Sequence, residues 1–169
     1  MPPQNFLKAQ LEEERFQHAL AYVRNESKGL KILSTSELVR LNQHLTGSKS
    51  DPWRTESTQV QLPTGDIHHF LLVTNPLQKV REIIGNAQLM AGNKDLLAAA
   101  TYLYSQMVLE HLFIDANRRT AVLAVMWLMS SYDQDVDAEK LINIPIGNIR
   151  NKTDLEKLRQ SIQESFLSK

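Results

Sequence analysis

The stretch HLFIDANRRTAVLAVMWLM, residues 111–129, joins a polar turn directly to an apolar run. A helix that is apolar nearly all round is buried at the centre of a bundle, so residues 120–129 predict a central helix. A second buried helix is expected to lead up to His111, because apolar residues recur at helical spacing before it. Polar side chains between two buried helices need partners, which makes this turn the candidate functional site. The apolar positions before the turn are Leu96, Ala100, Leu103 and Met107.

Helical patterns also dominate the N-terminal half of the chain. A first helix is expected over residues 6–23. STSE at 34–37 is a capping box that opens a second helix, which should stop near Gly47. The residues expected to face the core are Leu11, Phe16, Ala19, Leu20 and Val23 in the first helix and Leu38, Leu41 and Leu45 in the second.

The remaining helices are expected on both sides of the central pair. Pro76 suits the first turn of a helix that ends at Gly92, and we expect Asn93 to cap the helix after it. In that helix Tyr102 is expected in the core and Tyr104 at the surface. Residues 137–142 favour a short helix. TDLE at 153–156 is a second capping box, opening a last helix that should bury Leu155, Leu158, Ile162 and Phe166.

Residues 57–73, STQVQLPTGDIHHFLLV, depart from the helical pattern. Val60 and Leu62 alternate with polar neighbours and PTGD is a turn signal, which together predict a β-hairpin. The hairpin either covers a face of the bundle or offers its edge to an extended segment of a target protein. Because His68 and His69 are adjacent in a strand, they face opposite ways, which argues against a metal site formed by this pair.

The composition excludes several classes of protein. The chain has 169 residues, enough for one domain with a proper core, and its 19 basic and 19 acidic residues argue against a general nucleic-acid binder. It has no cysteine, so neither disulfides nor a thiolate metal site can form. The N-terminus lacks a secretory pattern, and the longest apolar run is far short of the about 20 residues that span a bilayer. We therefore expect a soluble, cytoplasmic protein that binds neither nucleic acid nor a membrane.

The residue types of the polar turn indicate phosphate chemistry. Helix N-termini carry unpaired N–H groups and a positive partial charge that hold phosphates, and Arg118 and Arg119 add positive charge there. Asp115 is a hard oxygen ligand suited to the Mg²⁺ that accompanies a nucleotide, and His111 can take up a proton near neutral pH. Each residue also has a plainer interpretation: a hydrogen-bonded histidine at a helix end, an aspartate N-cap and two solvated arginines.

The segment HLFIDANRRTA resembles the signature of the Fic/Doc (Fido-domain) family, His-x-Phe-x-Asp/Glu-Gly-Asn-Gly-Arg-x-x-Arg. GSKSDPWR at 47–54 is similar to the segment before the family's flap hairpin, residues 58–70 to the flap, and NPLQKVREII at 75–84 to the next helix. The resemblance implies an all-α, Fic-like helical bundle with one β-hairpin flap. It implies a single domain over 1–169, with a core at about 15–132 and a helical extension at about 137–167.

The resemblance implies a role for each matched residue. His111 matches the general base that deprotonates a target hydroxyl, Phe113 the aromatic anchor of the loop, and Asp115 the Mg²⁺-binding acid. Asn117 and Arg119 match residues that hold the nucleotide phosphates, and Ala116 and Arg118 complete the expected phosphate loop. The flap residues expected to dock the target are Val60, Gln61, Leu62, Ile67 and His68.

Such proteins usually transfer AMP from ATP, with Mg²⁺, to a Ser, Thr or Tyr of a target protein, but three departures leave the activity open. Ala116 replaces the first glycine, which is tolerable unless that position needs a positive φ. Arg118 replaces the second glycine, where the Doc branch carries lysine and transfers the terminal phosphate. Val122 replaces the second arginine. The alternatives are therefore AMP transfer, a Doc-like kinase toxin, binding of nucleotide or protein without turnover, and a helical adaptor.

The family's inhibitory signature, Ser/Thr-x-x-x-Glu-Gly/Asn, does not occur in this sequence. Three interpretations stay open. The activity is unrestrained, it is too weak to need restraint, or a partner such as an antitoxin restrains it. An effector would act in the cytosol of a host cell instead of that of the cell that makes it.

Overall fold

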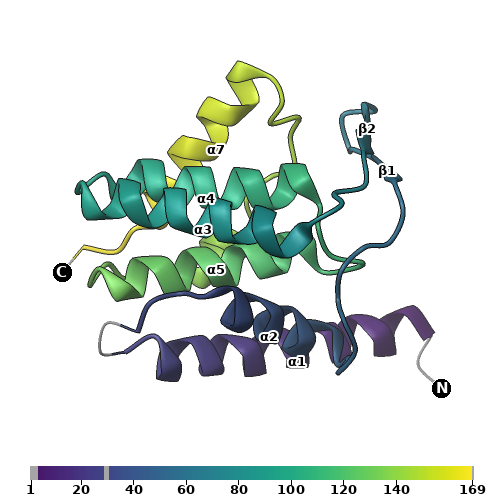
Figure 1. Ribbon diagram of the computed structural model, residues 1–169, viewed down its shortest axis with the longest axis horizontal. Coiled ribbons are helices and arrows are strands. Elements are labelled where there is room, and N and C mark those ends of the chain that lie inside the picture. Colours follow the sequence, from purple (N-terminus) through teal and green to yellow (C-terminus); the bar gives the residue numbers. More distant parts are fainter. Residues whose placement is uncertain (1–3, 29–30, 169) are drawn as a thin grey trace.

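The computed structural model describes residues 4–28 and 31–168, which form a helical bundle with one β-hairpin (Figure 1). The predicted fold class is confirmed. None of the helices in these two ranges is long and apolar enough to cross a membrane. The helices are α1 (Gln4–Glu26), α2 (Thr35–Thr46), α3 (Pro76–Gly92), α4 (Leu96–Glu110), α5 (Asn117–Ser131), α6 (Ala138–Ile142) and α7 (Lys152–Ser165). The strands are β1 (Thr58–Gln61) and β2 (Ile67–Phe70).

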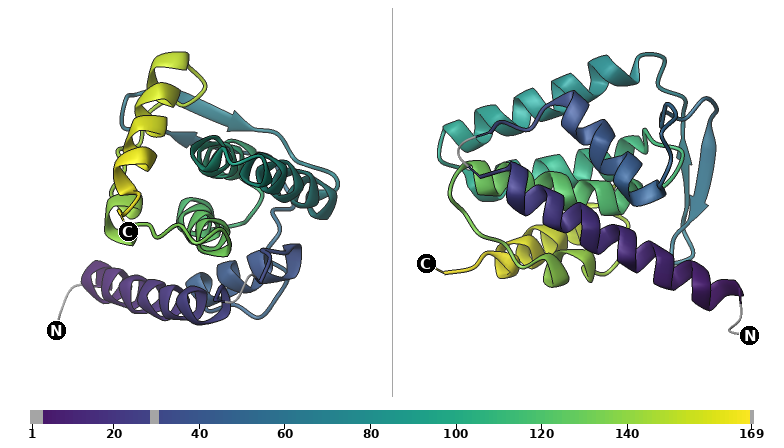
Figure 2. Two further views of the ribbon diagram at one scale, coloured as in Figure 1. Left: turned by 90° about the vertical axis from the view of Figure 1, so that its left-hand side faces the viewer. Right: turned by 90° about the horizontal axis from the view of Figure 1, so that it is seen from below.

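The central helix is α5, as its apolar run predicts. Every side chain from 120 to 129 is buried, and α5 packs against α4, α2, α1 and α6. Figure 2 shows α5 end-on in its left view, between the layer formed by α1 and α2 and the layer formed by α3 and α4. Fully burying one large apolar side chain contributes about 1.5–3 kcal/mol. Because α5 buries many of them, its packing fixes the position of its N-terminus, where the polar turn lies.

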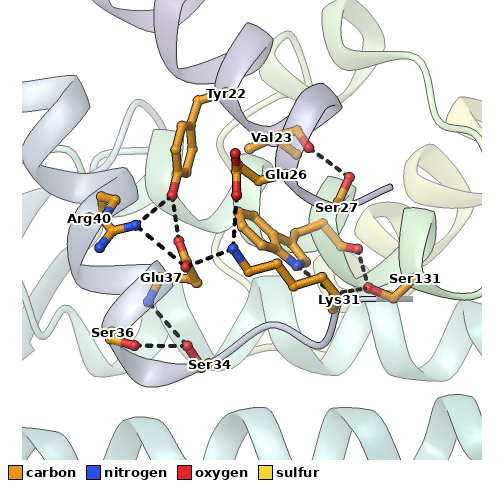
Figure 3. Close-up of polar contacts among 11 residues, drawn as sticks. Tyr22, Val23, Glu26, Ser27, Lys31, Ser34, Ser36, Glu37, Arg40 and Ser131 are labelled. Atoms are coloured by element: carbon orange, nitrogen blue, oxygen red, sulfur yellow. Dashed lines mark hydrogen bonds and ion pairs between the residues drawn. The ribbon is translucent and has the colours of Figure 1, made fainter. Parts of the chain in front are cut away.

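A cluster of polar side chains joins α1 to α2 (Figure 3). Ser34 forms half of the predicted capping box, since its side chain accepts a hydrogen bond from the Glu37 amide at 3.2 Å. The Glu37 carboxylate accepts a hydrogen bond from the Tyr22 hydroxyl at 2.8 Å and pairs with Lys31 at 3.2 Å. Burial raises the pKa of Glu37, but the contacts with Tyr22, Lys31 and Arg40 outweigh burial and leave it lowered.

Two predicted helix starts are wrong by two residues. Asn93 ends α3 instead of capping α4, and the side chain of Asp95 accepts the capping hydrogen bond from the Ala98 amide. Asn151, and not Thr153, caps α7 through the Asp154 amide. In both places several residues able to cap stand close together in sequence, and spacing alone does not choose between them.

Six side chains also differ from their predicted burial, and two of them, Leu96 and Phe166, are half-buried instead of buried. Leu11 is 45% exposed, because the N-terminal end of α1 projects beyond the other helices (Figure 2, right). Leu155 is exposed as well. Tyr104 is buried and Tyr102 only half-buried, the reverse of the prediction, because Tyr102 faces Asn86 of α3 while Tyr104 faces the start of α5.

Candidate active site

The hairpin and the turn between α4 and α5 lie at the same end of the bundle (Figure 1). Between them is a cavity of about 410 Å³ that is also lined by the segment joining α6 to α7. Six of the residues singled out from the polar turn line this cavity together: His111, Asp115, Ala116, Asn117, Arg118 and Arg119. Its other lining residues are Val60, Leu62, His68, Phe70, Val108, Ile114, Ile142, Ile146, Gly147 and Ile149.

His111 ends α4 in a left-handed conformation, with φ 46° and ψ 52°. Its half-buried imidazole stacks on the ring of Phe70, with ring centroids 4.5 Å apart. Burial lowers the pKa of His111, the Arg54 guanidinium lowers it further, and Asp115 acts in the opposite direction. A histidine with a lowered pKa is neutral near pH 7, which is the form that can accept a proton.

The N-terminus of α5 has no side-chain cap. Ala116 occupies the N-cap position and supplies no hydrogen bond, whereas each of α2, α3, α4, α6 and α7 is capped by a side-chain oxygen of the residue before it. The first amides of α5 are therefore available to an anion. Asp115 is not the cap, since its Oδ1 accepts a hydrogen bond from the Ala116 amide at 2.6 Å. The interpretation of Asp115 as an ordinary N-cap is thus wrong.

Ala116 has φ 59° and ψ 24°, in the left-handed region. Glycine adopts this conformation without a steric cost, whereas alanine adopts it at a cost of about 1–2 kcal/mol. The residue is buried, so its methyl group offsets part of that cost. The departure from the signature at this position therefore carries strain.

Asn117 and Phe113 close the loop between them. The amide of Phe113 donates to Asn117 Oδ1, and Asn117 Nδ2 donates to the Phe113 carbonyl, both at 2.9 Å. Both ends of the Asn117 amide are thus engaged by the backbone. Phe113 is fully buried and stacks on Trp53 at 4.9 Å, so Trp53 packs against the loop.

The two arginines leave α5 in different directions. Arg118 Nε donates to the Tyr104 hydroxyl of α4 at 2.9 Å, and its Nη2 is buried without a hydrogen-bond partner. Arg119 Nη1 lies 3.7 Å from a carboxylate oxygen of Glu12 in α1. Neither arginine is simply a solvated charge, as the plainer interpretation has it.

The flap residues fall into two groups. Strands β1 and β2 are antiparallel, with Val60 opposite His68 and Gln61 opposite Ile67. Val60, Gln61 and Ile67 are exposed and Leu62 is half-buried, so their docking role stays a prediction. His68 is buried, and its Nε2 lies 2.8 Å from Asn148 Oδ1. His69 is exposed, so the two histidines face opposite ways as predicted.

Asp115 is the residue that could hold a metal ion. Within residues 4–28 and 31–168 no three histidine, cysteine or acidic side chains are grouped closely enough to form a metal site. Mg²⁺ is commonly held by one or two carboxylates together with substrate phosphates and water. The exposed carboxylate of Asp115, next to the uncapped start of α5, fits such an ion when it arrives with a phosphorylated substrate.

Three contributors to this region were not predicted from the sequence. Arg54 bonds the carbonyl of His111, Tyr104 holds Arg118, and the segment 142–150 forms one wall of the cavity. In that segment Asn148 bonds His68, and Arg150 donates to the His69 carbonyl at 2.9 Å. The one sequence signal was the position of Arg54 at the end of the segment 47–54.

Solved structures identify the fold. The structure of a Fic domain containing signaling protein from Bacteroides thetaiotaomicron matches 94% of this chain and 67% of its own length, with a TM-score of 0.66 and 15% identity. The chain has the Fic fold. Fic-1 (residues 134–508) from C. elegans has a TM-score of 0.57 and 15% identity; the match covers 89% of this chain but 46% of that one. No family model and no curated protein matches the sequence.

Proposed function

We propose that this Fic-fold chain is a transferase that moves AMP from Mg-ATP to a hydroxyl side chain of a target protein. The observation that carries the proposal is the uncapped N-terminus of α5, which lies beside one cavity with the imidazole of His111. A general base next to a preformed anion site is what phosphoryl or nucleotidyl transfer needs. Because ATP is abundant in the cytosol, we propose that the reaction takes place there.

In the proposed reaction, neutral His111 accepts the proton of the target hydroxyl while its oxygen attacks the α-phosphorus. The bond from that phosphorus to the bridging oxygen breaks, and pyrophosphate leaves. The first amides of α5 and the guanidinium of Arg119 stabilise the charge on the transferring group. Asp115 would hold the Mg²⁺, which neutralises charge on the triphosphate. We assign Asn117 to shaping the loop, because its amide is engaged by Phe113.

The second candidate is transfer of the γ-phosphate, as in the Doc branch. Two residues favour it. Val122 is fully buried at the position of the signature's second arginine, so no guanidinium reaches the phosphates from there. Arg118 is a long cation at the second glycine position, where the Doc branch carries lysine. Its hydrogen bond to Tyr104 directs it toward α4. Either reaction takes the target protein and ATP as partners, and an inhibitory antitoxin is a further partner that we infer from the resemblance alone.

ATP labelled at the α- or the γ-phosphate separates these activities. We expect the α-label to enter a protein band in a cell lysate, and His111→Ala to reduce labelling by at least about 100-fold. His18→Ala, at an exposed position of α1, is the matched control and should leave labelling unchanged. Transfer of the γ-label instead would establish the kinase. Tight ATP binding without transfer of either label would indicate a binding protein, and no ATP affinity would indicate an adaptor.

A further inference from the structure

The guanidinium of Arg54 is buried and bonded entirely to backbone carbonyls. Only 8% of the residue is exposed. Its Nε donates to the His111 carbonyl at 2.8 Å, Nη1 to the Phe70 carbonyl at 3.1 Å, and Nη2 to the Leu71 carbonyl at 2.9 Å. A further hydrogen bond joins Nη1 to the carbonyl of Glu56. A buried charge is tolerated in a fold only when it is well hydrogen-bonded, and here the four carbonyls provide those bonds.

These carbonyls belong to segments that are far apart in sequence. Glu56 precedes the hairpin, Phe70 and Leu71 lie at its end, and His111 ends α4. The guanidinium is a rigid planar group with five donors, so it can hold two segments at a fixed separation. Lysine has three donors on one atom and cannot reproduce this arrangement. Arg54 therefore fixes the end of the flap relative to the candidate base.

The backbone around Arg54 is itself fastened to the polar turn. The Arg54 amide donates to the Leu112 carbonyl, and the Ile114 amide donates to the Pro52 carbonyl, both at 2.9 Å. Trp53 stacks on Phe113 between these two bonds. The backbone that carries the Arg54 side chain is therefore hydrogen-bonded to the turn that follows His111.

The residue held by Arg54 also touches the imidazole. The carbonyl of Phe70 accepts a hydrogen bond from Arg54, and the ring of Phe70 stacks on the ring of His111. A shift of β2 would therefore move the surface against which the imidazole packs. His111 cannot compensate easily, because its backbone is already held in the left-handed region.

We propose that Arg54 is a positioning residue that holds the flap at a fixed place relative to His111. A target that docks on the flap then presents its hydroxyl group to the imidazole. The part of this proposal that concerns the hydroxyl rests on the proposed function, whereas the coupling of flap to imidazole does not. The positive charge of Arg54 also contributes to the lowered pKa of His111, in second place to burial.

The test uses Arg54→Lys, which keeps the charge, and Arg54→Met, which keeps most of the stem but removes the charge. We expect both variants to raise the KM for the target protein about tenfold or more, because a displaced flap pairs less well with the target, and to leave the KM for ATP within about twofold of wild type, because the start of α5 is untouched. Arg81→Lys, an exposed arginine of α3, is the matched control. An equal rise in both KM values, or no rise in either, would overturn the proposal.

A spectroscopic measurement makes the test independent of activity. In the folded variants, the nuclear Overhauser effect between the rings of Phe70 and His111 should be lost, while that between Trp53 and Phe113 is retained. Retention of the first effect would overturn the coupling even if no transfer is ever detected. Absence of transfer by the wild-type protein counts against the proposed function and not against the coupling.

Phe70→Leu provides a second route if neither arginine variant folds. This substitution keeps the carbonyl and its hydrogen bond to Arg54 but removes the stacked ring. We expect the KM for the target to rise and the KM for ATP to stay unchanged. Wild-type values for both constants would overturn the proposal.

Discussion

The ring of Phe70 lies nearly parallel to the imidazole of His111, with centroids 4.5 Å apart and planes inclined by 22°. Phe70 ends β2 and His111 ends α4, so this contact joins the flap to the candidate base. The stack covers one face of the imidazole with an apolar ring. Burial of this kind disfavours the charged form of histidine, which sets the direction of the first prediction.

The stability of the protein should depend on pH through His111. Its pKa is lowered in the folded protein from an ordinary value of 6.5, first by burial and then by Arg54, against the effect of Asp115. The unfolded chain therefore binds the proton more readily, and the free energy of unfolding falls as the pH drops below about 6.5. Urea unfolding between about pH 5 and pH 8 measures this. In His111→Gln this part of the pH dependence of the free energy of unfolding should vanish. If the free energy of unfolding of His111→Gln falls with pH as steeply as that of the wild type, His111 is not its cause.

Ala116→Gly should stabilise the protein. The left-handed φ of 59° strains alanine but not glycine, while glycine loses a buried methyl group and gains entropy in the unfolded chain. We expect a net gain of about 0.5–1 kcal/mol in the free energy of unfolding. Ala121→Gly, one turn into the same helix and fully buried, should instead destabilise by about 1 kcal/mol or more. Losses of similar size at both positions would show that Ala116 is not strained.

Tyr104→Phe should weaken ATP binding by releasing Arg118. The substitution removes only the hydroxyl that accepts from Arg118 Nε at 2.9 Å, leaving a second donor of a largely buried guanidinium without an acceptor. Hydrogen bonds to charged groups contribute about 1.5–3 kcal/mol. We expect a several-fold rise in the dissociation constant for Mg-ATP, measured by calorimetry, and a lower melting temperature.

Tyr102→Phe is the control for this prediction. Its hydroxyl lies on the same helix but bonds the exposed Asn86 of α3 at 3.0 Å, away from the cavity. It should leave ATP binding as in wild type. Equal losses in the two variants would mean that the effect comes from α4 as a whole and not from Arg118.

The sequence predicted the elements whose signal is local. The apolar run of 120–129 identified the central helix, and the polar turn before it identified residues that line one cavity. Prediction from the sequence failed in two situations: where two local signals compete, and where a residue contacts another that is distant in sequence. Asn93 and Asp95 are both good caps; the backbone amide of Asn93 closes the end of α3, and Asp95 caps α4. Which tyrosine of α4 is buried depends on what α3 and α5 present to it.

Arg54 is an example of a residue whose contacts are distant in sequence. Nothing at its own position indicates that it reaches His111 and Leu71, because those contacts span 57 and 17 residues of sequence. The same holds for Asn148, which meets His68 across 80 residues. Contacts of this length are set by the tertiary arrangement, and single-sequence periodicity does not contain them.

Glu12→Gln should strengthen ATP binding with little effect on stability. The Glu12 carboxylate lies 3.7 Å from Arg119 Nη1, and the two side chains are 37% and 21% exposed. An ion pair so open to solvent contributes less than about 1 kcal/mol, so the melting temperature should change little. Removal of a negative charge beside Arg119 should lower the dissociation constant for Mg-ATP a few-fold, and added salt should diminish the difference.

Glu13→Gln is the matched control for Glu12→Gln. The Glu13 carboxylate accepts a hydrogen bond from Gln17 at 2.8 Å on the exposed side of α1. If both variants bind ATP alike, Arg119 does not contact the nucleotide, and its assignment to the phosphates fails.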